Sequence, residues 1–371
     1  MLKVIELFAG VGSQTESLKE IGIKHEVVAI SENDKYASRA YELLHGKVNN
    51  LGDIRDIKEL PSADLWTYSF PCTDISLAGT QKGFDKGSNT QSSLIWEVER
   101  LLNKANENDN LPSILLMENV RALVSKKFIK DFEVWLKYLE SLGYKNTYQI
   151  LNAKNYNTPQ NRERVFLFSF RDNFEYEFPE KQELLIKLGD LLEETVDDKY
   201  FISIARINNF SDMTNRNGFI RGLTFKPLEI TSPIAYTITT RSGARSTDNF
   251  IIVPENTKKG FKEADVGDGI YINRPYQKRG VVQKSKIPTL KTTPNDLGVI
   301  VNKDDLISLR KITPREAWRL MGWKDSRIDL VINEFSDAQL YKMAGNGIVI
   351  NVLKEMFKKL EILRWKNENS S

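Results

Sequence analysis

Short apolar runs alternate with helical patterns along the first half of the chain. The first run, LKVIELF at residues 2–8, is nearly continuous, as expected for a strand buried on both faces of a sheet. Similar runs predict further strands at residues 26–30, 64–70, 113–117, 144–151 and 165–170. Helices are predicted from Ser13, from near Lys35, over residues 94–105 and over residues 123–139. This alternation indicates an α/β fold with a mixed, mostly parallel sheet.

From residue 184 onward the alternation fails. Residues 184–192 are compatible with a short helix. Residues 200–305 contain only short β-type runs divided by Gly, Pro, Asn and Ser, such as 235–240 and 249–253. We therefore expect a second, smaller and irregular β-rich domain. The expected boundaries are 1–183 for the first domain, 184–325 for the second, and 326–371 for a C-terminal segment that returns to the first.

Helical patterning resumes near residue 313. Thr313 suits an N-cap, Pro314 the first helical position, and Glu316 the third position of a capping box. Residues 344–347 are expected to open a last helix. Its apolar side should pack on the first domain.

Cys72 is the only cysteine among 371 residues, and it follows Pro71 directly after the predicted strand 64–70. Proline has no N–H to donate, so regular strand pairing stops there and the thiol lies at the strand's carboxyl end. In open α/β sheets, that edge is where ligands bind. A lone cysteine is more often a small buried apolar residue, but this position favours a thiol that meets substrate.

The composition is typical of a soluble globular protein, with 40% hydrophobic and 28% charged residues. No stretch approaches the roughly 18 consecutive apolar residues of a membrane span, so we expect no membrane partner and a cytoplasmic location. One cysteine permits no internal disulfide, and with only His25 and His45 there is no Cys/His cluster for zinc. We expect no metal, and a monomer.

The first predicted strand ends in a glycine turn, Gly10-Val11-Gly12, that leads into a helix. These glycines either let the backbone approach a ligand or serve only the geometry of a tight turn. Glu32, about twenty residues further on, can accept hydrogen bonds from ribose hydroxyls; alternatively it caps the helix near Lys35. With Asp53, the pattern predicts an adenosine pocket. No GxxxxGK[ST] motif occurs, so phosphate transfer has no support.

Two further features lie near predicted strand ends. Glu118 closes the strand 113–117 and is expected at the same edge of the sheet as Cys72. Arg162 and Arg164, two residues apart on extended backbone, point the same way. They either pair with surface acids or offer guanidinium donors to a base oxygen and a phosphate.

The net charge is only +3, but basic residues cluster locally. Residues 274–291 carry six bases and no acid, and residues 206–245 are also mainly basic. Such clusters indicate contact with phosphates, although a solvated basic face is the commoner explanation for any single cluster.

Taken in order, these features resemble the cytosine-C5 DNA methyltransferase family of bacteria and phages along nearly the whole chain. The matching motifs are Phe8-Ala9-Gly10-Val11-Gly12, Glu32, Asp53, Phe70-Pro71-Cys72 with Ser76, Glu118-Asn119-Val120, Gln160-Asn161-Arg162-Glu163-Arg164, Arg315-Glu316, Arg319-Leu320-Met321-Gly322 and Gly345-Asn346. Thr289-Leu290 resembles the Thr-Leu doublet of that family's target recognition domain. The resemblance implies a Rossmann-like catalytic domain at residues 1–183 and a target recognition domain at residues 184–325.

The resemblance also implies roles for individual residues. Cys72 would be the nucleophile, and Glu118, Arg162 and Arg164 would grip the target cytosine. The cofactor S-adenosyl-L-methionine, which leaves as S-adenosyl-L-homocysteine, would be held by Phe8, Ala9, Gly10, Gly12, Glu32, Asn33, Asp53, Ile54, Pro71, Leu94 and Asn346. Contacts to double-stranded DNA are expected from Ser76, Gln160 and Thr289. Arg241, Arg245 and Arg279 of the basic clusters are further candidates, for phosphates first and for guanine edges second.

Two positions depart from the family's pattern. Asn33 stands where an aromatic side chain usually stacks on adenine, so we expect weaker stacking, partly supplied by Ile54. Gly347 stands where the family commonly has Ser. Neither position touches the reaction centre.

The expected chemistry explains why these residue types are needed. Cytosine C5 is a poor nucleophile, and addition of a thiolate to C6 raises the electron density at C5. The addition drives negative charge toward N3 and O2 of the base, where Glu118 and Arg164 can offset it. The base must leave its helix to reach the thiol, at a cost that closure of the loop 73–92 would help to offset.

We therefore expect a DNA (cytosine-5-)-methyltransferase that acts on a specific short duplex sequence, in restriction–modification or in phage DNA modification. A functional pairing with a restriction endonuclease is compatible with this role. The nearest alternative is a tRNA cytosine-C5 methyltransferase, but the Cys-Phe-Thr tripeptide of such relatives is absent and the long segment 184–309 favours DNA. An inactive DNA-binding regulator is a further alternative, although Cys72, Glu118 and both arginines are present.

Overall fold

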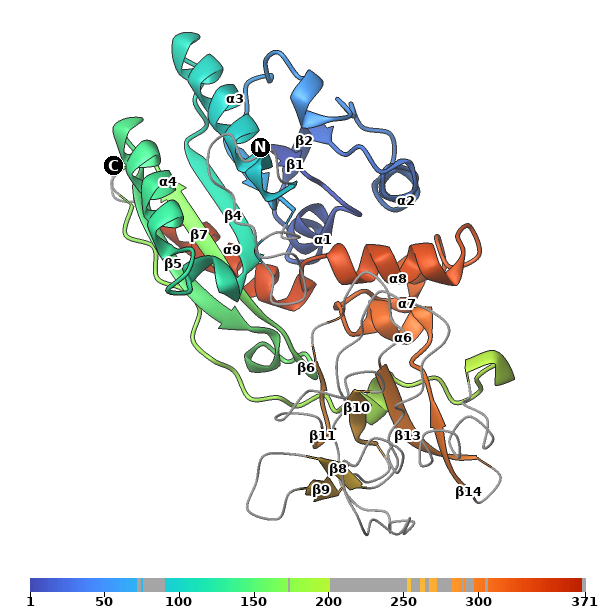
Figure 1. The fold of residues 1–371 in the computed structure, drawn as a ribbon. Helices are drawn as coiled ribbons and strands as arrows, with labels where there is room; N and C mark the ends of the chain where they lie inside the picture. The colour runs from blue at the N-terminus through green and yellow to red at the C-terminus, as the bar shows by residue number, and fades with distance from the viewer. Residues whose placement is uncertain are drawn as a thin grey trace. The chain divides into compact units, whose positions relative to one another are not determined.

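The computed structural model (Figure 1) describes residues 1–71, 75, 91–172, 174–200, 252–254, 261–263, 267–271, 282–288, 290, 297–303 and 306–368. Two compact units form within the chain: one contains Met1–Asn152, Glu163–Lys181 and Gly347–Ser371, and the other contains Ala153–Arg162 and Gln182–Asn346. The boundaries expected from the sequence differ from these units at residues 153–162, 182–183 and 326–346. The division by role, into cofactor-binding and recognition domains, stays a prediction.

The first unit is built on a six-stranded sheet with the strand order β2-β1-β3-β4-β7-β5. Its strands are β1 Leu2–Leu7, β2 His25–Ser31, β3 Leu65–Tyr68, β4 Ile114–Val120, β5 Lys145–Asn152 and β7 Glu163–Phe170. β1 pairs in parallel with β2 and β3, and β3 with β4, whereas β7 runs antiparallel to β4 and β5. The expected mixed, mostly parallel sheet is confirmed.

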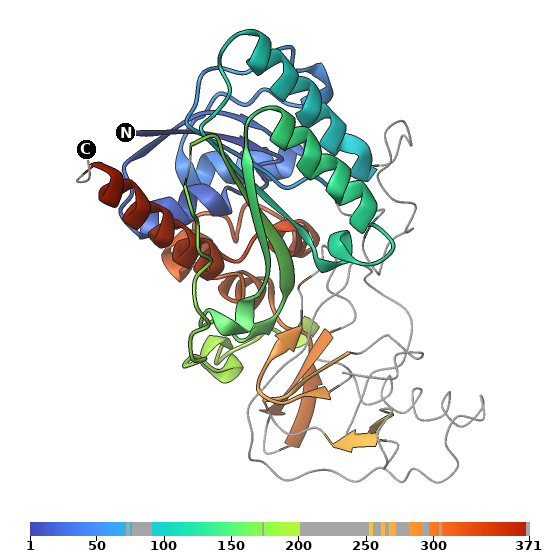
Figure 2. The same ribbon diagram turned by 90° about the vertical axis from the view of Figure 1, so that its left-hand side faces the viewer.

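Helices lie on both faces of this sheet (Figure 2). They are α1 Ser13–Glu20, α2 Lys35–His45, α3 Ile95–Glu107, α4 Ile129–Ser141 and α9 Ile350–Glu368. α3 and α4 share one apolar core with Ile5 and Leu7 of β1, and Trp96 packs edge to face on Trp135 there. The intervening Glu6 points the other way, toward α1, because side chains alternate along a strand. α9 packs on α1, and both helices belong to the first unit.

The described part of the second unit holds an antiparallel sheet with the strand order β11-β10-β13-β14. These strands are β10 Gly269–Tyr271, β11 Val282–Gln283, β13 Leu297–Lys303 and β14 Leu306–Arg310. Two small pairs join β8 Ile252–Pro254 to β9 Phe261–Glu263, and β6 Gln160–Asn161 to β12 Ile287–Pro288. The helices are α6 Pro314–Arg319, α7 Asp325–Ile328 and α8 Asp337–Asn346. Short strands of this kind fit the expected irregular β-rich character.

Single 3-10 turns connect many of these elements. In the first unit they are η1 Ile54–Asp56, η2 Gln91–Leu94 and η3 Arg121–Val124. In the second they are η4 Ala153–Asn155, η5 Leu188–Leu191 and η6 Asp198–Tyr200. Among the described residues, no helix has the length and hydropathy that crossing a bilayer requires.

Of the helices and strands predicted in the second half of the chain, some are confirmed and others are wrong. The capping box of α6 is confirmed, because the Glu316 N–H donates to the Thr313 hydroxyl and the Thr313 N–H donates to the Glu316 carboxylate. The helix expected over 184–192 is wrong, since only the turn η5 forms and Leu188 alone of that stretch is buried. The run 249–253 overlaps β8, whereas the run 235–240 lies outside the described residues.

The expectation that residues 344–347 open a helix is also wrong. Asn346 ends α8, and α9 begins only at Ile350. The buried side chains of Leu340, Met343 and Ala344 continue the apolar face of α8 up to that end.

Candidate active site

Most residues predicted to do chemistry in the first unit gather at one edge of its sheet. The parallel strands β1, β2, β3 and β4 all end there, and the antiparallel β7 begins there, with Arg164 opposite Val120. Glu32 follows the end of β2, and Glu118 lies near the end of β4. Because ligands bind at the carboxyl edge of such sheets, this edge is the candidate site.

Glu118 and Arg164 form an ion pair at this edge. The Arg164 Nε atom lies 3.0 Å from the Glu118 Oε1 atom, and the two side chains are only 14% and 9% exposed. Arg164 Nη1 also donates to the Glu163 carbonyl at 2.8 Å, which orients the guanidinium group. Charges shielded from water act more strongly on their neighbours. The pair can therefore present a carboxylate and cationic donors to a base bound at this edge.

Side chains from β4 and η2 hold the main chain just before Cys72. Asn119 Nδ2 donates to the Phe70 carbonyl at 3.0 Å, and the Ser92 hydroxyl donates to the Pro71 carbonyl at 2.8 Å. Both donor residues are buried. The approach to the cysteine is thereby tied to the strand that carries Glu118. Cys72 itself and Ser76 lie outside the described residues.

The turn after β1 has left-handed backbone, with φ angles of 57° at Phe8, 58° at Gly10 and 77° at Gly12, while Ala9 is buried. The Gly10 N–H donates to Glu32 Oε2 at 2.8 Å. A Cβ atom added to Gly10 would meet no described atom within 4 Å. This open space at a glycine suits a ligand that approaches the backbone closely.

Gly12 has a different role, because a Cβ atom there would lie 2.5 Å from His45 Nε2 and 2.6 Å from Tyr41 Cε2. His45 Nε2 also lies 3.0 Å from the Val11 carbonyl oxygen, within hydrogen-bond distance. α2 thus supports the turn from behind. Close packing therefore explains Gly12, whereas the approach of a ligand to the open space at Gly10 stays a prediction.

Glu32 does not cap α2, so that alternative is wrong. Asp34 Oδ1 caps the helix by accepting from the N–H groups of Tyr36 and Ala37. Glu32 Oε1 accepts from the Asp34 N–H at 2.7 Å, which anchors its carboxylate between the glycine turn and the start of α2. Its contact with a ribose stays a prediction.

Asp53 and Asn33 lie together beside this edge. Asn33 Nδ2 donates to Asp53 Oδ2 at 3.2 Å. The Arg55 side chain donates to both Asp53 oxygens, at 2.9 and 2.6 Å, and these hydrogen bonds hold the pKa of Asp53 well below its usual range. Ile54 is buried in the core that α3 and α4 share, and Leu94 packs against the same core.

Glu6 is a buried acid to which the sequence pattern assigned no role. Its Oε1 atom accepts from the Thr15 N–H at 2.8 Å and from the Thr15 hydroxyl at 2.7 Å. Burial raises the pKa of Glu6 from 4.5 to about 7, against the lowering effect of hydrogen bonds from Thr15 and Tyr41. Burial likewise raises the pKa of Tyr41. The available signal was a single acid inside the apolar run 2–8.

The predicted site residues of the second unit are placed differently. Gln160 is fully buried, Arg162 is 3% exposed, and both donate to main-chain carbonyls of the same unit. Asn346, predicted to hold the cofactor, is exposed at the end of α8. Arg241, Arg245, Arg279 and Thr289 lie outside the described residues.

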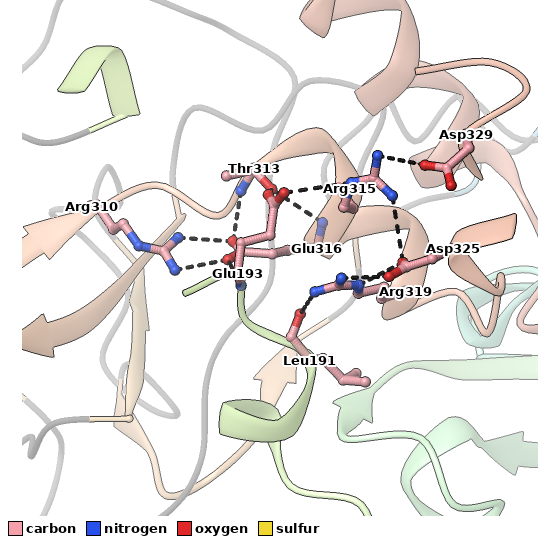
Figure 3. Close-up of polar contacts among 9 residues, drawn as sticks. All are labelled: Leu191, Glu193, Arg310, Thr313, Arg315, Glu316, Arg319, Asp325 and Asp329. Carbon is pink, nitrogen blue, oxygen red and sulfur yellow. Dashed lines mark hydrogen bonds and ion pairs between the residues drawn. The ribbon is translucent and has the colours of Figure 1, made fainter. Parts of the chain in front are cut away.

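An ion-pair network joins β14 to α6 (Figure 3). Arg310, the last residue of β14, donates to both oxygens of Glu316 at 2.7 and 2.8 Å, and both side chains are buried. Glu316 also accepts from the N–H groups of Thr313 and Glu193. The outer pairs are Arg315–Glu193, Arg315–Asp325, Arg315–Asp329 and Arg319–Asp325. The network fixes the end of the antiparallel sheet to the Arg315-Glu316 motif.

No three His, Cys, Asp or Glu side chains in the described part of the chain form a group that could hold a metal ion. The architecture itself defines the class, an α/β protein with a Rossmann-like sheet and a polar site at its carboxyl edge. Comparison with known proteins defines the family.

The sequence pattern of the family described as C-5 cytosine-specific DNA methylase matches residues 2–361. Type II methyltransferase M2.ScrFI of Lactococcus lactis subsp. cremoris is 33% identical over 97% of this chain and 99% of its own length. Type II methyltransferase M.NlaX of Neisseria lactamica is 29% identical over 97% of this chain and 96% of its own.

Solved structures agree in fold. The S. pombe Dnmt2 methyltransferase aligns with a TM-score of 0.61 and 19% identity over 97% of both chains. A putative DNA modification methyltransferase encoded within an E. coli prophage aligns with a TM-score of 0.57 and 17% identity over 98% of this chain and 99% of its own. The chain belongs to the C-5 cytosine-specific DNA methylase family, and it is a DNA cytosine-C5 methyltransferase. The resemblance inferred from its motifs is confirmed.

Proposed function

We propose that this enzyme transfers a methyl group from S-adenosyl-L-methionine to C5 of a cytosine flipped out of a specific short duplex sequence, through a transient bond between Cys72 and C6. The observation that carries the proposal is the shielded Glu118–Arg164 pair, with its 3.0 Å separation, at the edge where Asn119 holds the main chain that leads to Cys72. A base at this edge would meet a carboxylate and a guanidinium beside the nucleophile's strand. These are the groups that addition to C6 requires.

The residues at the glycine turn fit the proposed cofactor. The open space at Gly10 admits close approach of a ligand to the backbone, and the anchored carboxylate of Glu32 can accept from ribose hydroxyls. Asp53, whose low pKa keeps it ionised, can accept from the adenine amino group. Phe8 and Leu94 pack against the core beside it and would line the pocket. When bound, the cofactor supplies an electrophilic methyl group.

The protein's own groups manage charge and protons on the cytosine. The thiolate of Cys72 forms a bond to C6, and the electron pair of the C5–C6 double bond moves into the ring toward C5, N3 and O2. Glu118, in its protonated form, gives its proton to N3, and Arg164 donates to O2, so the developing negative charge is offset; N3 returns that proton to Glu118 when the ring is restored. Once C5 carries the methyl group, loss of the C5 proton to water or hydroxide and departure of the thiolate restore the aromatic ring.

In this proposal, the second unit recognises the target DNA sequence. Its basic clusters, which include Arg241, Arg245 and Arg279, suit contact with phosphates first and with guanine edges second, because most protein–DNA hydrogen bonds go to the backbone. Relatives of this chain are named type II methyltransferases, and a relative from Bacillus phage SPR is named an orphan methyltransferase. A role in restriction–modification or in phage DNA modification follows, with or without a partner nuclease.

Methylation assays test this proposal. With radiolabelled cofactor, we expect label on plasmid DNA and none on tRNA; label only on tRNA would contradict the proposal. Bisulfite sequencing of plasmid grown with the enzyme then identifies the target sequence. Cys72→Ala should abolish transfer while leaving cofactor binding, measured by calorimetry, unchanged. Loss of both would mean that the substitution acts through folding.

A further inference from the structure

Gln160 and Arg162 bring together three stretches of the second unit that are far apart in sequence. Gln160 Nε2 donates to the Leu320 carbonyl at 2.7 Å, and the Leu290 N–H donates to Gln160 Oε1 at 3.0 Å. Arg162 Nη1 donates to the Leu290 carbonyl at 2.7 Å, and Nη2 donates to the Gly345 carbonyl at 3.0 Å. Leu290 is thus held at both its N–H and its carbonyl group.

The Gln160 amide and the Arg162 guanidinium are the groups that would have to contact DNA or cytosine, and both are engaged in these hydrogen bonds. Gln160 is 0% exposed and Arg162 is 3% exposed, so neither side chain reaches the surface where a duplex would bind. A buried guanidinium loses its hydration, and its hydrogen bonds to the Leu290 and Gly345 carbonyls help to compensate for that cost. Arg164 differs, because it pairs with the carboxylate of Glu118.

Backbone pairing fixes the same stretch of chain. β6 and β12 pair in parallel, with Ile287 opposite Gln160 and Pro288 opposite Asn161. The Ile287 N–H also donates to the Pro159 carbonyl at 2.9 Å. Ile287 and Leu290 are both buried. Ile287, Pro288 and Leu290, here called the clamped segment, therefore have a single register against residues 159–162.

We propose that Gln160 and Arg162 are positioning residues: they set the register of the clamped segment, and this register determines how selectively the enzyme binds its target duplex. The inference rests on the proposed function, in which the second unit meets DNA. It replaces the roles that the family resemblance implies for the two residues, a DNA contact for Gln160 and a cytosine contact for Arg162. The reaction itself stays with Cys72, Glu118 and Arg164.

Kinetics of the full-length enzyme test this assignment. Gln160→Leu, Arg162→Met and Arg162→Lys are assayed on a duplex with the target sequence found for the wild type, and on a duplex with one altered base beside the target cytosine. Arg121→Met is the matched control, because Arg121 is 64% exposed and pairs only on the surface with Glu163. All variants are compared at saturating cofactor.

We expect the KM for cognate DNA to rise and the discrimination against the altered duplex to fall, each by about tenfold or more, because buried hydrogen bonds are lost. The kcat on saturating cognate DNA should stay within about threefold of wild type. Arg162→Lys keeps a cationic donor and should recover part of the discrimination lost in Arg162→Met. A large fall in kcat, with KM and discrimination unchanged, would place Arg162 at the reaction centre and overturn the proposal.

Hydrogen exchange gives a readout that does not depend on activity. Because the Leu290 N–H donates to Gln160, Gln160→Leu should speed exchange in a peptide spanning residues 287–290 and leave a β1 peptide unchanged. Unchanged protection at residues 287–290 would overturn the proposal.

Two further outcomes distinguish a failure of this proposal from unfolding of the variant and from a failure of the proposed function. If exchange speeds up throughout the chain, Gln160→Leu has unfolded the protein, and Gln160→Glu is then the variant that tests the proposal. Gln160→Glu keeps the acceptor for the Leu290 N–H but loses the donor to the Leu320 carbonyl. The contact with Leu320 should therefore loosen, while the Leu290 N–H stays protected. If the wild-type enzyme methylates no DNA, the proposed function fails, whereas the exchange result still decides whether Gln160 holds the clamped segment.

Discussion

The buried carboxyl group of Glu6 predicts how the free energy of unfolding changes with pH. Its side chain is fully buried behind the glycine turn, and burial raises its pKa from 4.5 to about 7. In the unfolded chain the carboxyl group titrates near its ordinary value. Between these two pKa values, the folded protein therefore holds a proton that the unfolded chain has released. The stability linked to this proton is complete below about pH 4.5 and is lost as the pH rises toward 7.

The size of this loss follows from linkage. Each pH unit between the two pKa values costs about 1.4 kcal/mol, so the full loss is about 3–4 kcal/mol. Glu6→Gln removes the titration and keeps an oxygen that Thr15 can use as its acceptor. Relative to wild type, the free energy of unfolding of the variant should rise by about 2–3 kcal/mol between about pH 5 and pH 8.

Urea denaturation of both proteins across this pH range measures the difference. Other titrating groups contribute equally to wild type and variant, so they cancel. Glu59→Gln, at an exposed position, is the matched control and should follow the wild type at every pH. If the difference between Glu6→Gln and wild type stays constant with pH, the buried carboxyl does not have a raised pKa and the reasoning fails.

The remaining predictions concern the turn, the ion pair at the sheet edge and the network around α6. Gly10→Ala should weaken cofactor binding by about tenfold in calorimetry, because a Cβ atom fills the open space and strains a left-handed residue. Gly12→Ala should instead lower the melting temperature, since its Cβ atom meets α2; equal effects of the two variants on binding would contradict this distinction. Glu118→Gln should slow single-turnover methyl transfer by about 10²–10⁴-fold with cofactor binding intact, and a rate near wild type would remove Glu118 from the chemistry. Arg310→Met should lower the free energy of unfolding by about 3–5 kcal/mol, because it leaves the buried Glu316 without its cation; an unchanged urea midpoint would argue against a buried pair.

The sheet of the first unit could be predicted because its strands are buried on both faces. Continuous apolar runs mark such strands, and the polar residues that interrupt or follow them then fall at the carboxyl edge. Glu32 and Glu118 follow from that rule alone, whereas the place of Cys72 at the same edge stays a prediction. The cap at Thr313 was also predictable, because a capping box depends on residues three apart.

Partners that come from distant parts of the chain could not be predicted. Gln160 and Arg162 are polar types that are usually exposed, and nothing in their local sequence points to Leu290 or Gly345. Gly10 and Gly12 have the same local pattern, but only the folded helix α2 distinguishes open space from a close contact. Hydrophobic periodicity reports that a position is buried, not what it meets.

The measurement that tests the central claim most directly is capture of the bond between Cys72 and the target base. In duplex DNA with 5-fluorocytosine at the target, the fluorine replaces the proton that must leave C5, so the ring cannot be restored after methyl transfer. With the cofactor present, we predict a protein–DNA species that survives a denaturing gel, and no such species with Cys72→Ala. An enzyme that methylates ordinary cytosine in the same sequence yet never forms this species would contradict the account.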